Sequence, residues 1–175
     1  MRYYMFNKPK GCVTARRDER HRTVMDYFPE CDRDVLFPVG RLDRDTVGLM
    51  ILTNNGQLAH SVLSPKHHVE KVYRFTSAEP LKTGAEETFR EGVTLADGYE
   101  CKSAVLTLDE ERTSGEIILT EGKYHQIKRM IASTGNKVTS LERISFGGIA
   151  LDTTLSRGEW RYLTDEEIAL LTSQA

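Results

Sequence analysis

The sequence has no long apolar segment, few cysteines and no excess of charge of one sign. Its three cysteines, Cys12, Cys31 and Cys101, are widely spaced and form no C-x-x-C pair, so we expect reduced thiols. No apolar run approaches the roughly 18 residues that span a bilayer. The N-terminus also lacks the apolar core and cleavage site of a signal peptide. We therefore expect a cytoplasmic protein without a membrane partner.

A basic excess is missing as well, because 24 basic and 26 acidic residues give a net charge of −2. Proteins that bind nucleic acid indiscriminately usually carry a strong basic excess, so any RNA site must be local. Two basic clusters suit such a site, although the first could also be a solvated charged loop. The first contains Lys8, Lys10, Arg16, Arg17, Arg20 and Arg22, and the second contains Lys123, His125, Lys128 and Arg129.

The 175 residues contain no internal repeat or linker, and their number predicts one domain with one sizeable core. Runs rich in β-branched or aromatic residues predict strands. Because these runs do not alternate regularly with helices, we expect an α+β fold with helices packed on a mixed or antiparallel sheet. The predicted strands are Tyr3–Phe6, Val35–Val39, Val47–Leu52, Val69–Ser77, Ala104–Leu108, Glu116–Thr120, Lys137–Ser145 and Trp160–Leu163.

Short helices are predicted between and after the strands. One follows Asn55-Gly56 and ends before Pro65, because Leu58, Ala59, Val62 and Leu63 share a helical face. Two more should open at Thr83 and Thr164, since Thr83-x-x-Glu86 and Thr164-x-x-Glu167 both have capping-box spacing.

A fourth helix should begin near Tyr124 and end at Gly135. Its apolar positions follow helical spacing, so we expect the basic residues to face away from the core. The apolar face consists of Ile127, Met130, Ile131 and Thr134, and the polar face carries His125, Lys128 and Arg129.

Two aspartates, Asp43 and Asp45, lie between arginines just before an apolar strand. Arg41 and Arg44 would favour an ionised carboxylate, which suits a group that attacks rather than donates a proton. A surface turn of Arg–Asp pairs is the alternative. Asp43-x-Asp45-x-Val47 also fits the loose pattern of phosphatases that form an aspartyl-phosphate. Those enzymes need the apolar strand before the first aspartate, whereas here it follows.

The histidines do not predict a metal site. His60, His67, His68 and Glu70 lack the H-E-x-x-H spacing and any cysteine partner, so we expect no metal ligand set. Tyr73 lies in a predicted strand with Lys71 and Phe75 on the same face. Its ring could belong to the core or offer a stacking surface for a base.

Four ordered blocks resemble the RsuA-type pseudouridine synthases, and the His-Gln-Ile-Lys-Arg-Met wording looks most like the branch that modifies small-subunit ribosomal RNA. Further likeness at Gly147-Gly148-Ile149, Gly158-Glu159-Trp160-Arg161 and Leu163-Thr164 extends it over nearly the whole chain. The blocks are Asn7-Lys8-Pro9-Lys10-Gly11, Gly40-Arg41-Leu42-Asp43-x-x-Thr46-x-Gly48-Leu49, Glu70-Lys71-Val72-Tyr73 and Glu121-Gly122-Lys123-Tyr124-His125-Gln126-Ile127-Lys128-Arg129-Met130.

The resemblance implies a central, mostly antiparallel sheet with a cleft across its middle, and catalysis without a metal or an organic cofactor. It also resolves the choice between the aspartates, because Asp43 matches the family's catalytic aspartate. Tyr73 matches the active-site tyrosine, and Lys128 matches the basic residue that pairs with the aspartate.

The resemblance further implies contacts with ribosomal RNA, and we expect a monomer that acts on RNA of an assembling ribosomal subunit. We expect these contacts from Arg41, which would help to hold the flipped-out nucleotide, and from Lys8, Lys10, Arg16, Arg17, His125, Gln126 and Arg129. The motif wording favours small-subunit (16S) RNA, with large-subunit (23S) RNA or an RNA-binding module without catalysis as alternatives. We expect residues 1–175 to be the catalytic domain alone, without the S4-type RNA-binding domain with which these enzymes usually begin.

Overall fold

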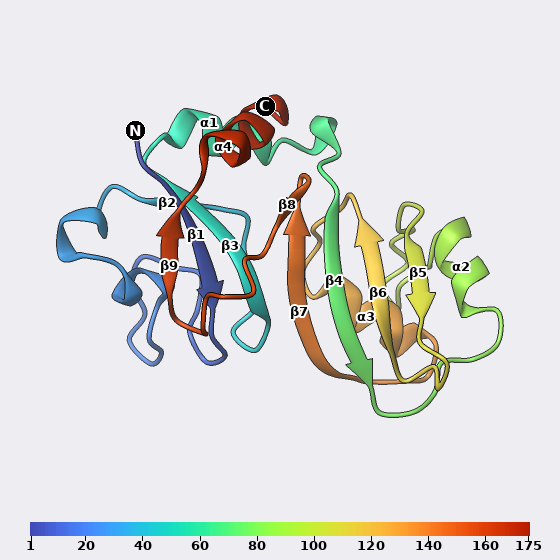
Figure 1. Cartoon of the computed structure of the whole chain (residues 1–175). Helices are drawn as coiled ribbons and strands as arrows, with labels where there is room; N and C mark the ends of the chain where they lie inside the picture. Colours follow the sequence, from blue (N-terminus) through green and yellow to red (C-terminus); the bar gives the residue numbers. More distant parts are fainter. The chain divides into compact units, whose positions relative to one another are not determined.

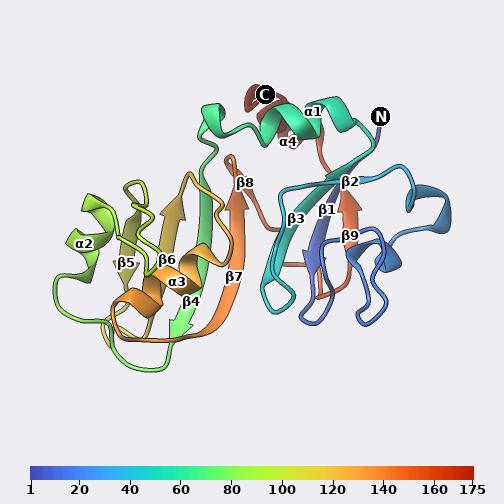
Figure 2. The same ribbon diagram turned by 180° about the vertical axis from the view of Figure 1, so that it is seen from behind.

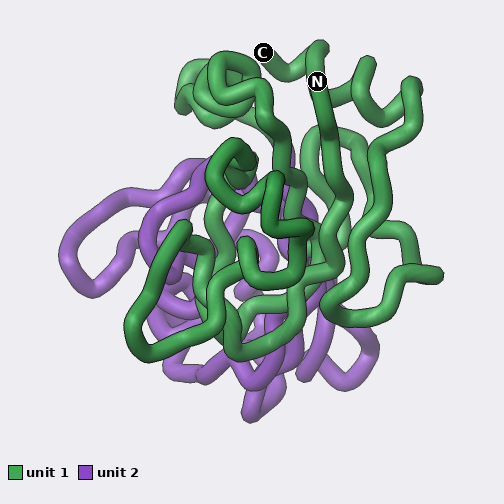
Figure 3. Tube along the Cα trace, turned by 90° about the vertical axis from the view of Figure 1, so that its left-hand side faces the viewer, with its two compact units in different colours: residues 1–69, 143–175 green, residues 70–142 purple.

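The computed structural model describes residues 1–175, which form two compact units (Figure 3). Unit 1, green in Figure 3, consists of residues 1–69 and 143–175, and unit 2, purple, consists of residues 70–142. Each unit combines antiparallel strands with short helices (Figures 1 and 2). The α+β class that the sequence predicts is therefore confirmed. None of the helices is both long enough and apolar enough to cross a membrane.

The strands of unit 1 are organised around β1 (Tyr3–Lys8). It pairs antiparallel with β3 (Val47–Thr53), in a register that sets Lys8 opposite Gly48, and β9 (Trp160–Tyr162) lies along its other edge. Strand β2 (Phe37–Val39) pairs with β3. The short strand β8 (Ile149–Ala150) pairs with the end of β7 (Val138–Phe146), whose residues up to Glu142 belong to unit 2.

Strand β1 is buried on both faces, because an apolar cluster covers one face and aromatic rings cover the other. Met5 points into an apolar cluster that includes Leu49, Ile51 and Phe146, next to helices α1 (Gly56–Val62) and α4 (Asp165–Ser173). Tyr4 points the other way, and its ring centroid lies 4.9 Å from that of Trp160 and 5.1 Å from that of Phe28. Short 3-10 helices at Val24–Tyr27, Glu30–Asp32 and Pro65–His67 complete the unit.

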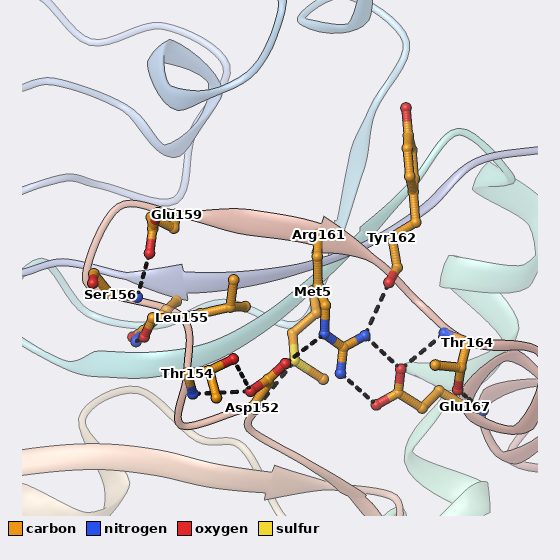
Figure 4. Close-up of polar contacts among 11 residues, drawn as sticks. Met5, Asp152, Thr154, Leu155, Ser156, Glu159, Arg161, Tyr162, Thr164 and Glu167 are labelled. Atoms are coloured by element: carbon orange, nitrogen blue, oxygen red, sulfur yellow. Dashed lines mark hydrogen bonds and ion pairs between the residues drawn. The ribbon is translucent and has the colours of Figure 1, made fainter.

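The capping box predicted at Thr164 is confirmed and joins a larger polar network (Figure 4). The Thr164 hydroxyl accepts from Glu167 N at 3.2 Å, and the Glu167 carboxylate accepts from Thr164 N at 2.9 Å. Arg161 of β9 donates to both Glu167 oxygens, at 2.8 and 3.1 Å, and to Asp152 at 2.9 Å. The guanidinium thereby ties β9, helix α4 and the loop at Asp152 together.

Unit 2 contains the whole strands β4 (Lys71–Ser77), β6 (Ser114–Leu119) and β5 (Val105–Leu108), which pair antiparallel in that order, and residues 138–142 of β7 next to β4. Helix α2 (Ala85–Glu91) packs against β5, and Figure 2 shows α3 (Gln126–Ser133) in front of the strands. Three members of the predicted apolar face of α3, Ile127, Met130 and Ile131, are buried, whereas the fourth, Thr134, is the half-buried C-cap. Gly135, with φ +81°, stands just beyond its end.

The capping box predicted at Thr83 is wrong. Helix α2 begins at Ala85, and its N-cap is Gly84, with φ +91° and no side-chain cap. A capping threonine needs an extended backbone at the N-cap itself, and here a left-handed glycine occupies that position. Glu86 instead pairs with Arg112, whose nitrogen lies 2.8 Å from its carboxylate.

Candidate active site

Asp43 lies in the loop of residues 40–46, immediately before strand β3. Thr46 N donates to Asp43 O at 3.0 Å, which closes a turn around the aspartate. Asp43 is half-buried, whereas Asp45 is exposed and lies 3.6 Å from Arg44. The structure thus gives the two aspartates different surroundings. The long apolar strand follows both of them, against the order that an aspartyl-phosphate phosphatase requires.

Lys8 fixes the end of this loop from inside the protein. Its side chain is fully buried, and its ammonium donates to Thr46 O at 2.8 Å, to Arg44 O at 3.0 Å and to Pro9 O at 3.0 Å. A buried ammonium is tolerated only where its hydrogen-bonding capacity is used, as it is here. The structure therefore gives Lys8 a structural place instead of the RNA contact that the sequence predicts.

Two further groups from the N-terminal segment hold the loop. The Thr14 hydroxyl is buried and lies 2.9 Å from Leu42 O and 3.2 Å from Leu42 N, so it can donate to the first and accept from the second. Gly11 N donates to Arg44 O at 2.9 Å. The backbone on both sides of Asp43 is consequently fixed by residues some thirty positions earlier in the chain.

The start of the loop packs against a buried arginine. Arg143 is 2% exposed, donates from Nε to Leu49 O at 2.9 Å, and lies over the Phe146 ring at 5.3 Å. Gly40 adopts φ +94°, and a Cβ added to it would lie 3.3 Å from an Arg143 nitrogen. Glycine at this position therefore allows the left-handed backbone and leaves room for the guanidinium of Arg143.

The neighbouring Asn7 fastens another loop of unit 1. Its side chain donates to Leu155 O at 2.8 Å and accepts from Arg157 at 2.6 Å, and its backbone N donates to Glu159 O at 3.0 Å. The adjacent pair Asn7-Lys8 thus organises two loops that are distant in sequence. Asn7 and Lys8 directly follow the predicted strand Tyr3–Phe6 and form the end of β1, so their place next to an apolar strand was the available sequence signal.

The other residues of unit 1 that the sequence predicts to contact RNA are on the surface. Lys10, Arg17 and Arg41 are exposed. Arg16 is exposed too, but its guanidinium donates to Asp34 O at 2.8 Å and lies 4.8 Å from the centre of the Phe37 ring. These four side chains are accessible to solvent, and their contact with RNA stays a prediction.

Tyr73 lies in unit 2, in the middle of β4 and opposite Ile117 of β6. Its side chain is 9% exposed and shares a strand face with Phe75, which is fully buried. Lys71, on the same face, donates to Glu121 O at 3.4 Å. The alternation predicted for this strand is confirmed.

Glu121 orders the loop that leads into α3. Its carboxylate accepts from the Tyr99 hydroxyl, from Lys102 N at 2.7 Å and from the Gln126 side chain at 3.0 Å. Burial alone would raise the pKa of Glu121, but these hydrogen bonds outweigh it and lower the pKa. The hydrogen bond between the Tyr99 hydroxyl and Glu121 raises the pKa of Tyr99 to about 12. Neither Tyr99 nor Glu121 was predicted, because both act through partners distant in sequence.

Helix α3 carries the remaining predicted residues. Lys128 and Arg129 are partly exposed, and Arg129 pairs with Asp97 at 2.6 Å. His125 precedes the helix with φ +46°. Gln126 is 4% exposed, and its amide is occupied by Glu121 and by Lys123 N at 3.0 Å. Gln126 therefore holds the loop together and, like Lys8, is not placed to contact RNA directly.

Asp43 belongs to unit 1, and Tyr73 and Lys128 belong to unit 2. The pairing of Lys128 with Asp43 stays a prediction. The three cysteines are all free. His60, His67, His68 and Glu70 form no group that could hold a metal ion, and neither does any other set of histidine, cysteine, aspartate or glutamate residues.

Known proteins similar to this chain are named as pseudouridine synthases. Residues 2–133 match the family described as RNA pseudouridylate synthase. The chain is 44% identical over 169 residues to ribosomal small subunit pseudouridine synthase A of Escherichia coli K12, covering 96% of this chain and 73% of that protein. It is also 44% identical over 173 residues to an uncharacterised RNA pseudouridine synthase of Bacillus subtilis, covering 97% of this chain and 72% of that protein.

A solved structure agrees with these relatives. A crystal structure described as a pseudouridylate synthase superposes with a TM-score of 0.92 at 40% identity, covering 97% of this chain and 73% of that one. The archaeal Nop10–Cbf5 complex of a box H/ACA particle matches with a TM-score of 0.58 at 15% identity, which shows a likeness of fold alone.

Proposed function

The chain belongs to the RNA pseudouridylate synthase family, and from this premise we propose that it converts a specific uridine of small-subunit ribosomal RNA into pseudouridine. The observation that carries the choice of RNA is the 44% identity, over 96% of the chain, to an enzyme named for the ribosomal small subunit. We place the reaction in the cytoplasm, on RNA of an assembling subunit, with a monomeric enzyme that needs no cofactor.

We propose Asp43 as the catalytic carboxylate. Isomerisation breaks the bond between C1′ and N1 of the nucleoside, joins C1′ to C5 of the uracil, and exchanges a proton on C5 for one on N1. An ionised carboxylate beside the sugar serves this reaction either as a nucleophile at C1′ or as a base. Support comes from the loop of residues 40–46, whose backbone is held by Lys8, Gly11 and Thr14. A fixed loop can deliver the carboxylate in one geometry.

Tyr73 is proposed as the aromatic residue of the site. Its ring is anchored in β4 beside the buried Phe75, so it offers a rigid flat surface for the uracil. A target uridine must first leave the RNA stack, which requires a few kcal/mol, and stacking on an aromatic ring offsets part of that penalty. If Asp43 instead acts as a base that removes a proton from the sugar, the phenol oxygen of Tyr73 is the proposed proton acceptor.

Lys128 is proposed to keep Asp43 ionised, since a nearby ammonium stabilises a carboxylate where water is scarce. Replacement by methionine keeps most of the packing of the side-chain stem but removes the charge. We expect Lys128→Met to lose most turnover, with RNA affinity only mildly weaker, and Lys128→Arg to restore part of it.

The measurement for Lys128 is single-turnover conversion of the target uridine, with affinity determined separately at fixed salt. Conversion of the uridine by Lys128→Met at the parental rate would show that the ammonium is not needed to keep Asp43 ionised. A loss explained entirely by weaker binding would make Lys128 a phosphate contact instead.

Exposed basic residues are proposed to bind the phosphate backbone, with Arg41 next to Asp43 holding the flipped-out nucleotide. Lys10, Arg16, Arg17, His125 and Arg129 complete this set. Such contacts fix the position of the RNA without reading its sequence.

The test of the proposed function is a map of pseudouridines in ribosomal RNA from cells with and without the gene. We expect one small-subunit site to disappear and to return when the parent gene is restored, but not with Asp43→Asn. Loss of a large-subunit site would keep the reaction and change the substrate. An unchanged map of both RNAs would contradict the proposal.

A further inference from the structure

Tyr124 is the most exposed aromatic residue of the chain, at 76%. Among the large apolar side chains only the first residue, Met1, is more exposed, at 82%. Single exposed apolar residues are common and need no function. At Tyr124, however, the ring is pre-stacked, its backbone is fixed and its neighbours are basic, and together these features point to a ligand.

The ring of Tyr124 is already part of a stack. It lies nearly parallel to the imidazole of His125, with 3.9 Å between centroids and 16° between planes. The left-handed backbone at His125, with φ +46°, accompanies this arrangement. One face of the phenol ring is therefore covered by imidazole, while the exposure of the side chain shows that most of the ring meets solvent.

The backbone that carries Tyr124 is fixed on both sides. Arg129 donates to Tyr124 O at 3.1 Å, and Lys123 N donates to the Gln126 side chain at 3.0 Å. Gln126 is held in turn by Glu121 at 3.0 Å. An aromatic ring on a fixed loop loses little conformational freedom when it binds, so the binding energy is not spent on ordering it.

The surroundings of the ring are charged, mainly basic. Lys123, the residue before Tyr124, is exposed and its ammonium lies 5.0 Å from the centre of the Tyr99 ring; Arg129 is 32% exposed, and Lys128 lies on the following helical turn. Asp97, which pairs with Arg129 at 2.6 Å, is the opposing carboxylate. A flat aromatic surface among cations suits a single-stranded nucleic acid, in which a base stacks while phosphates meet the charges. A protein partner would instead require a larger apolar patch.

We propose that Tyr124, stacked on His125, forms a platform on which an unpaired base of the substrate RNA stacks. This inference rests on the proposed function and adds a base contact outside Asp43, Tyr73 and Lys128. It also explains why an exposed aromatic ring stands in a loop whose other members are engaged in polar contacts.

The test compares the affinities of the parent protein, Tyr124→Phe and Tyr124→Ala for a protein-free small-subunit ribosomal RNA transcript. We expect phenylalanine to stay within twofold of the parent and alanine to bind roughly 5- to 150-fold more weakly, as expected for the loss of one stacked base. Tyr162→Ala, which removes another exposed tyrosine in unit 1, is the matched control and should bind as the parent does.

Salt dependence separates stacking from phosphate contact. Loss of the ring should leave the slope of log affinity against log salt unchanged, whereas Lys123→Met should reduce it by about 0.7, the value for one single-strand phosphate contact. Melting temperatures of the variants exclude a folding defect. Affinity of Tyr124→Ala within twofold of the parent would overturn the platform, and so would a loss accompanied by a changed slope.

A transcript containing 5-iodouridine provides a direct second readout, because iodinated uracil forms photo-crosslinks with an aromatic ring that it contacts. We expect a crosslinked peptide containing Tyr124 in the parent and no such peptide in Tyr124→Ala. A transcript that carries several crosslinks, none of them at Tyr124, would contradict the proposal. If the parent binds the transcript but converts no uridine in it, the proposed function fails, while the crosslink and the affinity ratio still decide the role of Tyr124.

Discussion

Replacement of Lys8 by methionine tests whether the buried ammonium holds the loop of Asp43. Methionine matches the length and the apolar character of the lysine stem, so the change removes mainly the charge and its three hydrogen bonds. The expected result is a less stable unit 1 and a displaced Asp43, with slower turnover as the consequence.

The size of the effect follows from what each carbonyl keeps. All three carbonyls lose the ammonium donor, but Arg44 O still accepts from Gly11 N and Pro9 O from the Cys12 thiol at 3.5 Å, so the main loss falls on Thr46 O. A buried acceptor without a donor costs about 1–3 kcal/mol, and removal of the buried charge relieves part of its desolvation. We expect a net loss of about 1–3 kcal/mol in the free energy of unfolding. Since a misplacement of about 1 Å can reduce the rate roughly a hundredfold, turnover should fall tenfold or more.

Urea unfolding measures the change in stability. It is monitored by the fluorescence of the single tryptophan, Trp160, which lies in unit 1. Lys10→Met is the matched control, because Lys10 is exposed and should change stability by less than about 0.5 kcal/mol. Single-turnover conversion under native conditions measures the functional effect. A Lys8→Met protein with parental stability and turnover would refute the role of the ammonium in fixing the loop.

Two further predictions concern the same unit. Thr14→Val is nearly isosteric but leaves Leu42 N and O without the hydroxyl, so the free energy of unfolding should fall by about 1–3 kcal/mol. Turnover should also fall, with RNA affinity unchanged. Turnover equal to that of the parent at saturating RNA would contradict this prediction. The pKa of Asp152 is lowered to about 2, mainly by hydrogen bonds from the Thr154 hydroxyl and amide and then by the hydrogen bond from Arg161. Because this pKa is depressed by folding, its stabilising contribution is present above pH 4 and is lost as the pH falls toward 2. Thr154→Val should therefore shift acid unfolding to higher pH, and an unchanged midpoint would show that the hydroxyl does not control the carboxylate.

Local sequence patterns predicted most elements but not their ends. The capping box at Thr164 holds and that at Thr83 does not, because Gly84 takes a left-handed conformation that moves the helix start by one residue. The predicted strand Val35–Val39 is shorter, beginning at Phe37, and Val35 is 41% exposed. Strand alternation around Tyr73 was readable because it depends only on neighbouring residues.

Long-range partners explain what the sequence did not reveal. Lys8 looked like a surface contact, yet it is buried among groups whose approach no local pattern encodes, such as the carbonyls of Arg44 and Thr46. The division into two units also lacks a sequence signal. Its boundaries, after Val69 and after Glu142, fall inside two predicted strands rather than in a linker.

The central claim is that Asp43, and not its neighbour Asp45, carries the chemistry. Single-turnover conversion of uridine in small-subunit ribosomal RNA by Asp43→Asn and Asp45→Asn tests it most directly. Asparagine is isosteric with aspartate but cannot act as an anionic nucleophile or base. We predict that Asp43→Asn, with parental stability and RNA affinity, forms no detectable pseudouridine, while the exposed Asp45→Asn stays within tenfold of the parent. Activity of Asp43→Asn within tenfold of the parent, or equal losses at the two positions, would contradict the account.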